Sequence, residues 1–254
     1  MQTVAIKNLT KKFGNTVALD NLSLNIAKGK ITGLIGSDGA GKTTLIRTII
    51  GLLIADKGEI SVLGYNPAHQ KYELNKHIGY MPQKFGLYED LTVIENLKLY
   101  ADLKNVPYNF EKMLEFTSLS PFQSRLAGAL SGGMKQKLGL ACTLLGKPDF
   151  LILDEPSVGV DPISRRDLMK MVKEMISPDT TVLWSTAYLD EAHSFDTTVV
   201  LNKGKIIYEG KPHDLALTPQ EFENKIIELM GGYKEQESLI AKNYEYHYKY
   251  CKNE

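Results

Sequence analysis

The chain has 254 residues, of which 43% are hydrophobic, and this is enough for one large α/β domain. Lysine and arginine together number 30, as do aspartate and glutamate, so the formal net charge of zero gives no reason to expect nucleic acid as a partner. The two cysteines, Cys142 and Cys251, lack the spacing of a disulfide framework or zinc site, and no apolar run approaches the ~18 residues of a membrane helix, so we expect a cytoplasmic protein.

Strand patterns dominate the N-terminal third of the chain. Residues 22–26 alternate apolar and polar side chains, as a half-buried strand does, and residues 31–35 read as a buried strand that runs into a glycine-rich turn. A helix is predicted over residues 42–50, and Gly51 is a plausible stop for it. Further strands are predicted over residues 4–9, 59–63 and 78–81.

The pattern then becomes helical. Residues from about 88 to 147 contain no convincing strand. Strand patterns return at residues 150–153, 181–184 and 198–201, and this alternation predicts an α/β fold with a mainly parallel sheet and an inserted helical segment. Within the insert, one amphipathic helix is assigned Leu91, Ile94, Leu97 and Leu99, and the buried face of another is assigned Leu138 and Cys142.

The C-terminal part contains one clear helix signal. Thr218 and Glu221 form a capping box with Pro219 at the first helical position, and the helix is expected to end near Met230. We therefore expect a single domain over residues 1–230, followed by a tail or linker over residues 231–254 that contains the tyrosine-rich stretch YEYHYKY. The sequence leaves open whether the chain is a complete protein or the first half of a longer one.

The strongest motif is GSDGAGKTT, which matches G-x-x-x-x-G-K-[ST] between a predicted strand and a predicted helix. We call residues 36–44 the glycine loop; its members are Gly36, Ser37, Asp38, Gly39, Ala40, Gly41, Lys42, Thr43 and Thr44. Glycines let the backbone N–H groups turn toward phosphate oxygens, and the following helix N-terminus favours negative charge. Lys42 is expected to reach the β- and γ-phosphates of a nucleotide, and Thr43 to bind Mg²⁺.

The stretch FLILDEP complements this loop, because its apolar strand ends in two carboxylates. Asp154 is expected to hold magnesium, directly or through water, and Glu155 to orient or deprotonate the attacking water. Without the glycine loop, an Asp-Glu pair after a strand would more often be the acidic start of a helix.

The segment LSGGMKQKL points to a family. Ser131 can cap a helix whose free N–H groups form a second anion site. Together with the glycine loop and LILDEP, it resembles the ATP-binding-cassette (ABC) ATPases over nearly the whole chain. The resemblance implies a P-loop NTPase core, an antiparallel β-subdomain and an inserted helical subdomain. It also implies head-to-tail dimers in which this signature segment contacts nucleotide held by the partner cassette; its residues are Ser131, Gly132, Gly133 and Met134.

The resemblance assigns roles to four further residues. Phe13 lies where the family has an aromatic ring that stacks on adenine, although a phenylalanine in a strand core is the alternative. Gln83 matches the glutamine that senses magnesium and the γ-phosphate, and Asp161 matches the carboxylate of a loop that crosses the dimer interface. Asp38 replaces a more usual asparagine, and we expect its carboxylate to point away from the phosphates.

The resemblance also implies a membrane partner. Family members without membrane spans pair with a permease at the inner face of the cell membrane, and here residues 83–92, including Phe85, Leu87 and Tyr88, would meet it. The motif details resemble bacterial multidrug-export cassettes, including tandem-cassette types, so ATP and Mg²⁺ are the expected cofactors and export is the expected function. The alternatives are a soluble ABC ATPase acting on ribosomes and a regulatory cassette with weak hydrolysis.

One position departs from the family. In WSTAYLDEAH, the residue after Ser-Thr is usually a histidine that contacts the γ-phosphate, but here it is Ala187. We call residues 185–188 the switch turn. His193 lies six residues further on and is expected to be a surface or packing histidine. We therefore expect the hydrolysis of ATP to be slowed at this chain's own glycine loop.

Overall fold

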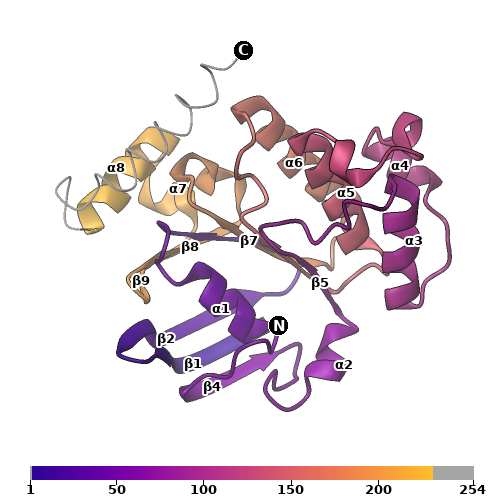
Figure 1. The fold of residues 1–254 in the computed structure, drawn as a ribbon. Helices are drawn as coiled ribbons and strands as arrows, with labels where there is room; N and C mark the ends of the chain where they lie inside the picture. The colour runs from indigo at the N-terminus through magenta and orange to yellow at the C-terminus, as the bar shows by residue number, and fades with distance from the viewer. Residues whose placement is uncertain (1, 231–254) are drawn as a thin grey trace.

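A computed structural model describes residues 2–230, apart from the side chains of residues 162–164. Cys251, the YEYHYKY stretch and the expected tail over residues 231–254 lie outside the described residues. The structure has the expected architecture, with a mainly parallel sheet, a separate antiparallel sheet and an inserted helical segment (Figure 1).

The larger sheet has the strand order β5-β6-β7-β3-β8-β9. Neighbouring strands run parallel from β5 to β8, as predicted, and only β9 is antiparallel to its neighbour. The strands are β5 (Ile78–Met81), β6 (Phe150–Asp154), β7 (Thr181–Thr186), β3 (Ile31–Ile35), β8 (Thr197–Asn202) and β9 (Lys205–Gly210). The strand β9 was not predicted, because its half-exposed residues KIIYEG form no uniform apolar run. Since parallel strands end at one edge, β3, β6 and β7 bring the glycine loop, Asp154 and the switch turn together.

The smaller sheet is antiparallel and has the order β2-β1-β4, with β1 (Gln2–Phe13), β2 (Thr16–Ala27) and β4 (Lys57–Val62). These strands are longer than the sequence pattern predicted, because their outer ends carry exposed residues that break the apolar alternation. Helix α1 (Lys42–Ile49) buries Leu45, Ile46 and Ile49 in the core shared with this sheet and with β6. That packing fixes the start of α1, and with it the end of the glycine loop.

The helical segment contains α3 (Val93–Lys104), α4 (Glu111–Phe116), the 3₁₀ turns η1 (Ser120–Phe122) and η2 (Ala127–Ala129), and α5 (Gly132–Leu144). It has an apolar core of its own, to which Leu97, Leu138 and Cys142 contribute as predicted. Leu91 instead lies before α3, because Thr92 caps that helix through a capping box with Glu95. In Figure 1 this segment lies on the side of the molecule opposite α8.

The remaining helices are short or flank the larger sheet. They are α2 (Lys71–Asn75), α6 (Pro162–Met175), the 3₁₀ helix η3 (Leu189–Ser194), α7 (Pro212–Leu215) and α8 (Pro219–Leu229). The capping box of Thr218 and Glu221 is formed, and α8 ends at Leu229 with Met230 as its C-cap, as predicted. Within residues 2–230, none of the helices is long and apolar enough to cross a membrane.

Candidate functional site

The glycine loop connects β3 to α1 and needs its glycines for geometric reasons. Gly39 and Gly41 adopt positive φ values of 78° and 110°, which side chains disfavour. A Cβ atom on Gly36 would lie 2.4 Å from the Leu201 carbonyl oxygen, and one on Gly41 would lie 2.7 Å from that of Ala18. No side chain caps α1 at Gly41, so the first N–H groups of this helix are available to an anion.

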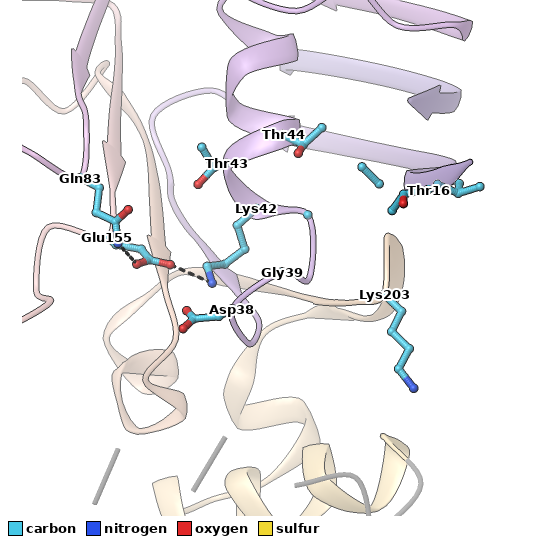
Figure 2. Close-up of a pocket in the computed structure, with 12 residues that line it drawn as sticks. Thr16, Asp38, Gly39, Lys42, Thr43, Thr44, Gln83, Glu155 and Lys203 are labelled. Carbon is cyan, nitrogen blue, oxygen red and sulfur yellow. Dashed lines mark hydrogen bonds and ion pairs between the residues drawn. The ribbon is translucent and has the colours of Figure 1, made fainter. Parts of the chain in front are cut away.

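Three predicted catalytic residues meet beside this loop (Figure 2). The Lys42 ammonium forms an ion pair of 2.9 Å with the Glu155 carboxylate, and the two side chains are only 4% and 9% exposed. Lys42 Nζ also donates to the carbonyl oxygens of Gly36 and Ser37, at 2.7 and 3.2 Å. Gln83 Nε2 donates to the other Glu155 oxygen at 2.8 Å. The structure therefore brings these residues together from β5, β6 and the glycine loop.

Ser185 ties the two carboxylates at the end of β6 to β7. Its hydroxyl donates to Asp154 Oδ1 at 2.7 Å and accepts from the Glu155 N–H at 2.9 Å. The parallel register pairs Asp154 with Ser185, which places that hydroxyl between the two residues. Glu155 has a φ of 52°, an uncommon value for a residue other than glycine. The hydrogen bond that the Glu155 N–H donates to the Ser185 hydroxyl supports this conformation, in which the Glu155 carboxylate pairs with Lys42.

A magnesium ion suits the oxygen donors near Asp154. Thr43 Oγ1 lies 3.4 Å from Asp154 Oδ1. Thr43 and Gln83 both line a cavity that opens over the glycine loop. The part of the chain that the structure describes contains no group of three or more histidine, cysteine, aspartate or glutamate residues able to hold a metal. These donors therefore fit a Mg²⁺ ion whose remaining ligands are phosphates and water, which is its usual coordination in nucleotide sites.

A cavity of about 540 Å³ opens over the glycine loop. In Figure 2, Thr16 and Lys203 lie on the side of the cavity opposite Gln83 and Glu155. The sequence indicated no role for four lining residues, Thr16, Val17, Ala18 and Lys203. The full lining is Thr16, Val17, Ala18, Asp38, Gly39, Gly41, Lys42, Thr43, Thr44, Gln83, Glu155 and Lys203.

The unpredicted part of the lining comes from the start of β2 and from the β8–β9 turn, neither of which carries a motif. Gly204 N–H donates to the Ala40 carbonyl oxygen at 2.9 Å, and Asp20 N–H donates to the Gly204 carbonyl oxygen at 2.9 Å. The β8–β9 turn is thus bonded to both the glycine loop and β2, and this holds Lys203 at the cavity. Gly204 indicates a turn in the sequence, but the neighbouring residues do not indicate that this turn contacts the glycine loop.

Phe13 is exposed rather than buried in a strand core, and Asp38 lies at the cavity. The Phe13 ring is 49% exposed, so its alternative role in a strand core is wrong. Phe13 pairs with Thr16, a lining residue, and the Lys11 ammonium lies 5.6 Å from the ring centroid. Asp38 is also among the residues that line the cavity. The orientation of its carboxylate away from the phosphates stays a prediction.

The signature segment and Asp161 lie outside this cavity. Ser131 caps α5 as predicted, since its hydroxyl accepts from the Met134 N–H at 3.4 Å. Ser131 and Gly132 are exposed, and Asp161 is exposed just before α6. None of them is among the residues that line the cavity. The chain therefore does not fold its own signature segment onto its own glycine loop.

The switch turn adjoins the glycine loop through the backbone. Gly36 N–H donates to the Thr186 carbonyl oxygen at 3.2 Å, so Ala187 is the residue next to this contact with the glycine loop. His193 points elsewhere: its ring centroid is 4.5 Å from that of His213 and 5.8 Å from that of Phe222, against α7 and α8. Burial, and then the neighbouring His213, lower the pKa of His193. His193 is therefore a packing residue, as predicted.

The stretch over residues 83–92 has a mixed surface. Phe85 and Leu87 are partly buried against the apolar cores, whereas Tyr88 is 51% exposed. Tyr88 is thus the exposed aromatic residue of this stretch.

Comparison with known proteins gives a consistent result. The family model described as "ABC transporter" matches residues 19–158. The chain is 53% identical over 222 residues to the probable multidrug ABC transporter ATP-binding protein YbhF of Escherichia coli K12, covering 85% of this chain and 38% of that protein. It is 34% identical over 248 residues to the Nod factor export ATP-binding protein I of Rhizobium etli, covering 95% of this chain and 78% of that protein. The chain thus spans well under half the length of YbhF.

Solved structures show the same fold. The ADP conformation of MJ1267, an ATP-binding cassette of an ABC transporter, matches with a TM-score of 0.76 and 30% identity, over 92% of this chain and 100% of that one. A dimeric post-hydrolysis state of the cassette MJ0796, bound to ADP and Pi, matches with a TM-score of 0.73 and 27% identity, over 82% of this chain and 98% of that one.

Proposed function

Because the chain belongs to the ABC transporter family, we propose that it binds and hydrolyses ATP as a cassette that dimerises and drives a membrane permease, as part of an exporter. The observation that carries this proposal is the buried ion pair of Lys42 and Glu155 beside the glycine loop, to which Gln83 adds a hydrogen bond. Lys42 and Glu155 supply the two charges that phosphoryl transfer to water requires, one for the phosphates and one for the water.

Nucleotide binding would begin with an exchange of partners at Lys42. The buried Lys42 ammonium is neutralised by the Glu155 carboxylate at 2.9 Å. The β- and γ-phosphates of ATP would replace that carboxylate, assisted by the backbone N–H groups of the glycine loop. Thr43, Asp154 and Gln83 are the residues that would hold Mg²⁺, which supplies neutralising charge between the phosphates. The exchange would leave Glu155 free for a water molecule.

The chemical step would then use Glu155 as the base. A water oxygen forms a bond to the γ-phosphorus, the bond to the β–γ bridging oxygen breaks, and ADP and inorganic phosphate result. Glu155 accepts the proton that the water loses. Gln83 and the Ser185 hydrogen bond would keep the carboxylate in place, since each already contacts residue 155 directly.

The exposed signature segment supports a composite site. Ser131 and Gly132 are exposed at the start of α5. This helix has thirteen residues, and the N–H groups of its first turn favour an anion. We propose that Ser131, Gly132, Gly133 and Met134 contact the γ-phosphate region of ATP held by a second cassette. Asp161 would lie at the same head-to-tail interface. The dimer of MJ0796 bound to ADP and Pi is a precedent among similar cassettes.

The transport role rests on the relatives. YbhF is described as a probable multidrug transporter protein and the Rhizobium protein as a Nod factor export protein. We propose that this chain works at the inner face of the cell membrane through a permease, which would meet residues 83–92 near Tyr88. The transported substrate is left unassigned.

A second function is favoured by Ala187. An alanine there can neither donate a hydrogen bond to the γ-phosphate nor titrate. A regulatory cassette would bind ATP with the same glycine loop, hydrolyse it slowly, and complete a more active site on a different cassette.

The test compares two lysines of equal charge. Lys42→Ala should abolish ATP hydrolysis and weaken ATP binding by at least tenfold, because about 1.4 kcal/mol of phosphate contact is a minimum for such a residue. Lys205→Ala is the matched control, since Lys205 is an exposed residue paired with Asp20 at 3.2 Å. Equal affinities in both variants would refute the glycine-loop assignment. Co-purification with an integral-membrane permease would support the transport role, and ATP-dependent co-sedimentation with ribosomes would contradict it.

A further inference from the structure

A polar cluster lies behind the switch turn, away from the cavity. It contains four residues. Ser157 lies two positions after Glu155, and Arg165 belongs to α6. Tyr188 is the last residue of the switch turn, and Glu191 belongs to η3. We call these four residues the turn cluster. None of them lines the cavity over the glycine loop. The function proposed above assigns no role to their side chains.

Arg165 is the centre of the cluster. Its guanidinium carbon lies 4.1 Å from the centroid of the Tyr188 ring, a cation–π contact. One of its terminal nitrogens lies 3.7 Å from Glu191 Oε1 and 3.4 Å from Asp190 Oδ1. The Arg165 side chain is only 10% exposed, while Asp190 is 58% exposed. Arg165 therefore contacts the last residue of the switch turn and the start of η3, and its pair with Glu191 is the sheltered one.

Glu191 is a buried carboxylate with an incomplete set of partners. Its side chain is 11% exposed, and neither of its oxygens accepts a hydrogen bond of ordinary geometry. Burial raises the pKa of Glu191, while the nearby Thr186 and Ser157 hydroxyls and Arg165 lower it. The Ser157 hydroxyl and Arg165 Nε are likewise buried without a hydrogen-bond partner. A buried carboxylate is costly unless it is paired, so the ion pair with Arg165 is what retains Glu191 in this place.

The cluster connects to the reacting groups through short backbone paths. Thr186 lies beside Glu191, and its carbonyl oxygen accepts from the Gly36 N–H of the glycine loop. Ser185, the preceding residue, bonds both Asp154 and the backbone of Glu155. A displacement of the turn would therefore move the hydroxyl that supports the strained backbone of Glu155.

We propose that Arg165 and Glu191 are positioning residues for hydrolysis: their buried ion pair holds the alanine-bearing switch turn in place and thereby keeps Ser185 and Glu155 aligned. The turn needs such a hold because Ala187 contributes no polar side chain toward the nucleotide. This inference rests on the proposed ATPase function. It assigns the pair no contact with ATP, so the pair should affect the rate of hydrolysis and leave the affinity for ATP unchanged.

Two neighbouring carboxylates of the same arginine provide the test. In the full chain, Glu191→Gln should lower kcat for ATP about tenfold per ATP-binding site, as expected for a shifted catalytic group, with the ATP Kd unchanged within about twofold. Asp190→Asn is the matched control and should leave kcat within about twofold, because Asp190 is exposed and screened. Arg165→Lys should lower kcat, since lysine keeps the charge but loses the planar contact with Tyr188.

Hydrogen exchange separates this inference from the proposed function, because it needs no ATP hydrolysis. Glu191→Gln should speed amide exchange in peptides covering residues 153–158 and 185–192, while peptides from β1 and β2 keep wild-type exchange. Wild-type exchange in the first two peptides would overturn the positioning role, whether or not the chain hydrolyses ATP. Equal losses of kcat in Glu191→Gln and Asp190→Asn would overturn it too, since charge near Arg165 would then matter and the buried pair would not. An inactive wild type with faster exchange in the variant would refute the ATPase alone.

Discussion

The glycine loop and the signature segment both lie at helix starts for which we propose anion binding, but the two differ in their surroundings. The loop side is buried and paired: Lys42 is 4% exposed and contacts Glu155, Gly36 and Ser37. The signature side faces solvent, and among the described residues the Ser131 side chain accepts a hydrogen bond from the Met134 N–H alone. One site is thus assembled within the chain, and the other is presented on its surface.

This difference indicates where each half obtains its precision. Three parallel strands end at one edge and hold the loop side, with Ser185 bridging β7 to β6 and Thr186 bonded to Gly36. The signature segment begins α5, which contributes Leu138 to the core of the helical segment and Leu140 to a core of the larger sheet. Its own first residues, Ser131 and Gly132, are exposed. A site that is preorganised in one part and exposed in another suits a nucleotide that is enclosed only when two chains meet.

The largest effect should come from the paired side. Glu155→Gln removes the proposed base while keeping the hydrogen bond from Gln83, and hydrolysis should fall by about 10²–10⁴ with ATP binding retained. The variant also removes the carboxylate that competes with phosphates for Lys42, so ATP should accumulate on a trapped dimer. Single-turnover hydrolysis and size-exclusion chromatography with ATP measure both effects. A wild-type rate in this variant would remove Glu155 as the base.

The exposed side should show its effect in the other chain. Ser131→Arg places bulk and charge at a cap that touches nothing in its own cavity, so hydrolysis at the partner's glycine loop should fall by about tenfold or more. Mixed dimers of this variant with Lys42→Ala distinguish the sites, because one composite site then carries both changes and the other carries neither. Recovered activity in the mixture is the expected result. A defect confined to the variant's own glycine loop would argue against the composite site.

The cavity edge lies between these extremes. Phe13 is exposed beside Thr16 with Lys11 over its ring, so Phe13→Ala should weaken ATP binding about tenfold by removing ~1–3 kcal/mol of stacking. Tyr72→Ala is a matched control, since Tyr72 is 77% exposed with the Lys76 ammonium 4.7 Å from its ring centroid, but outside the cavity lining. Isothermal titration with ATP and with GTP measures the affinities. If both variants bind ATP equally well, Phe13 does not contact the base.

The parts of the fold that were predictable are those with local signals. Strand β3 was predicted with its observed bounds because it is uniformly buried, and α8 because Thr218, Pro219 and Glu221 form a cap in the sequence itself. The strand β9 and the start of α3 were missed, since the first has a half-exposed pattern and the second depends on which polar residue forms the cap.

The candidate site divides in the same way. Lys42, Asp154 and Glu155 stand in contiguous motifs, and the structure brings them together as the motifs imply. Ser185, Lys203 and Glu191 were assigned no role from the sequence. The positions of Ser185 and Lys203 depend on strand register and on long-range hydrogen bonds. A sequence pattern does not carry such register, so the residues that position the reacting groups appear only in three dimensions.

The smallest effect, and the sharpest test of the comparison, is expected at Ala187. This residue follows Thr186, whose carbonyl oxygen accepts from the Gly36 N–H, so a longer side chain here would start next to the glycine loop. Ala187→His should raise kcat for ATP a few-fold, since one hydrogen bond to a charged group is worth about 1.5–3 kcal/mol at best and part of it is spent on ordering the ring. Ala187→Leu adds similar bulk without a donor and should lower kcat or leave it unchanged. If histidine and leucine give the same rate, the alanine does not limit hydrolysis, and the regulatory reading loses its main support. If histidine alone raises the rate, the glycine-loop site lacks one contact with the γ-phosphate. The Arg165–Glu191 ion pair, which we propose to hold the switch turn, would then compensate for that missing contact in this chain.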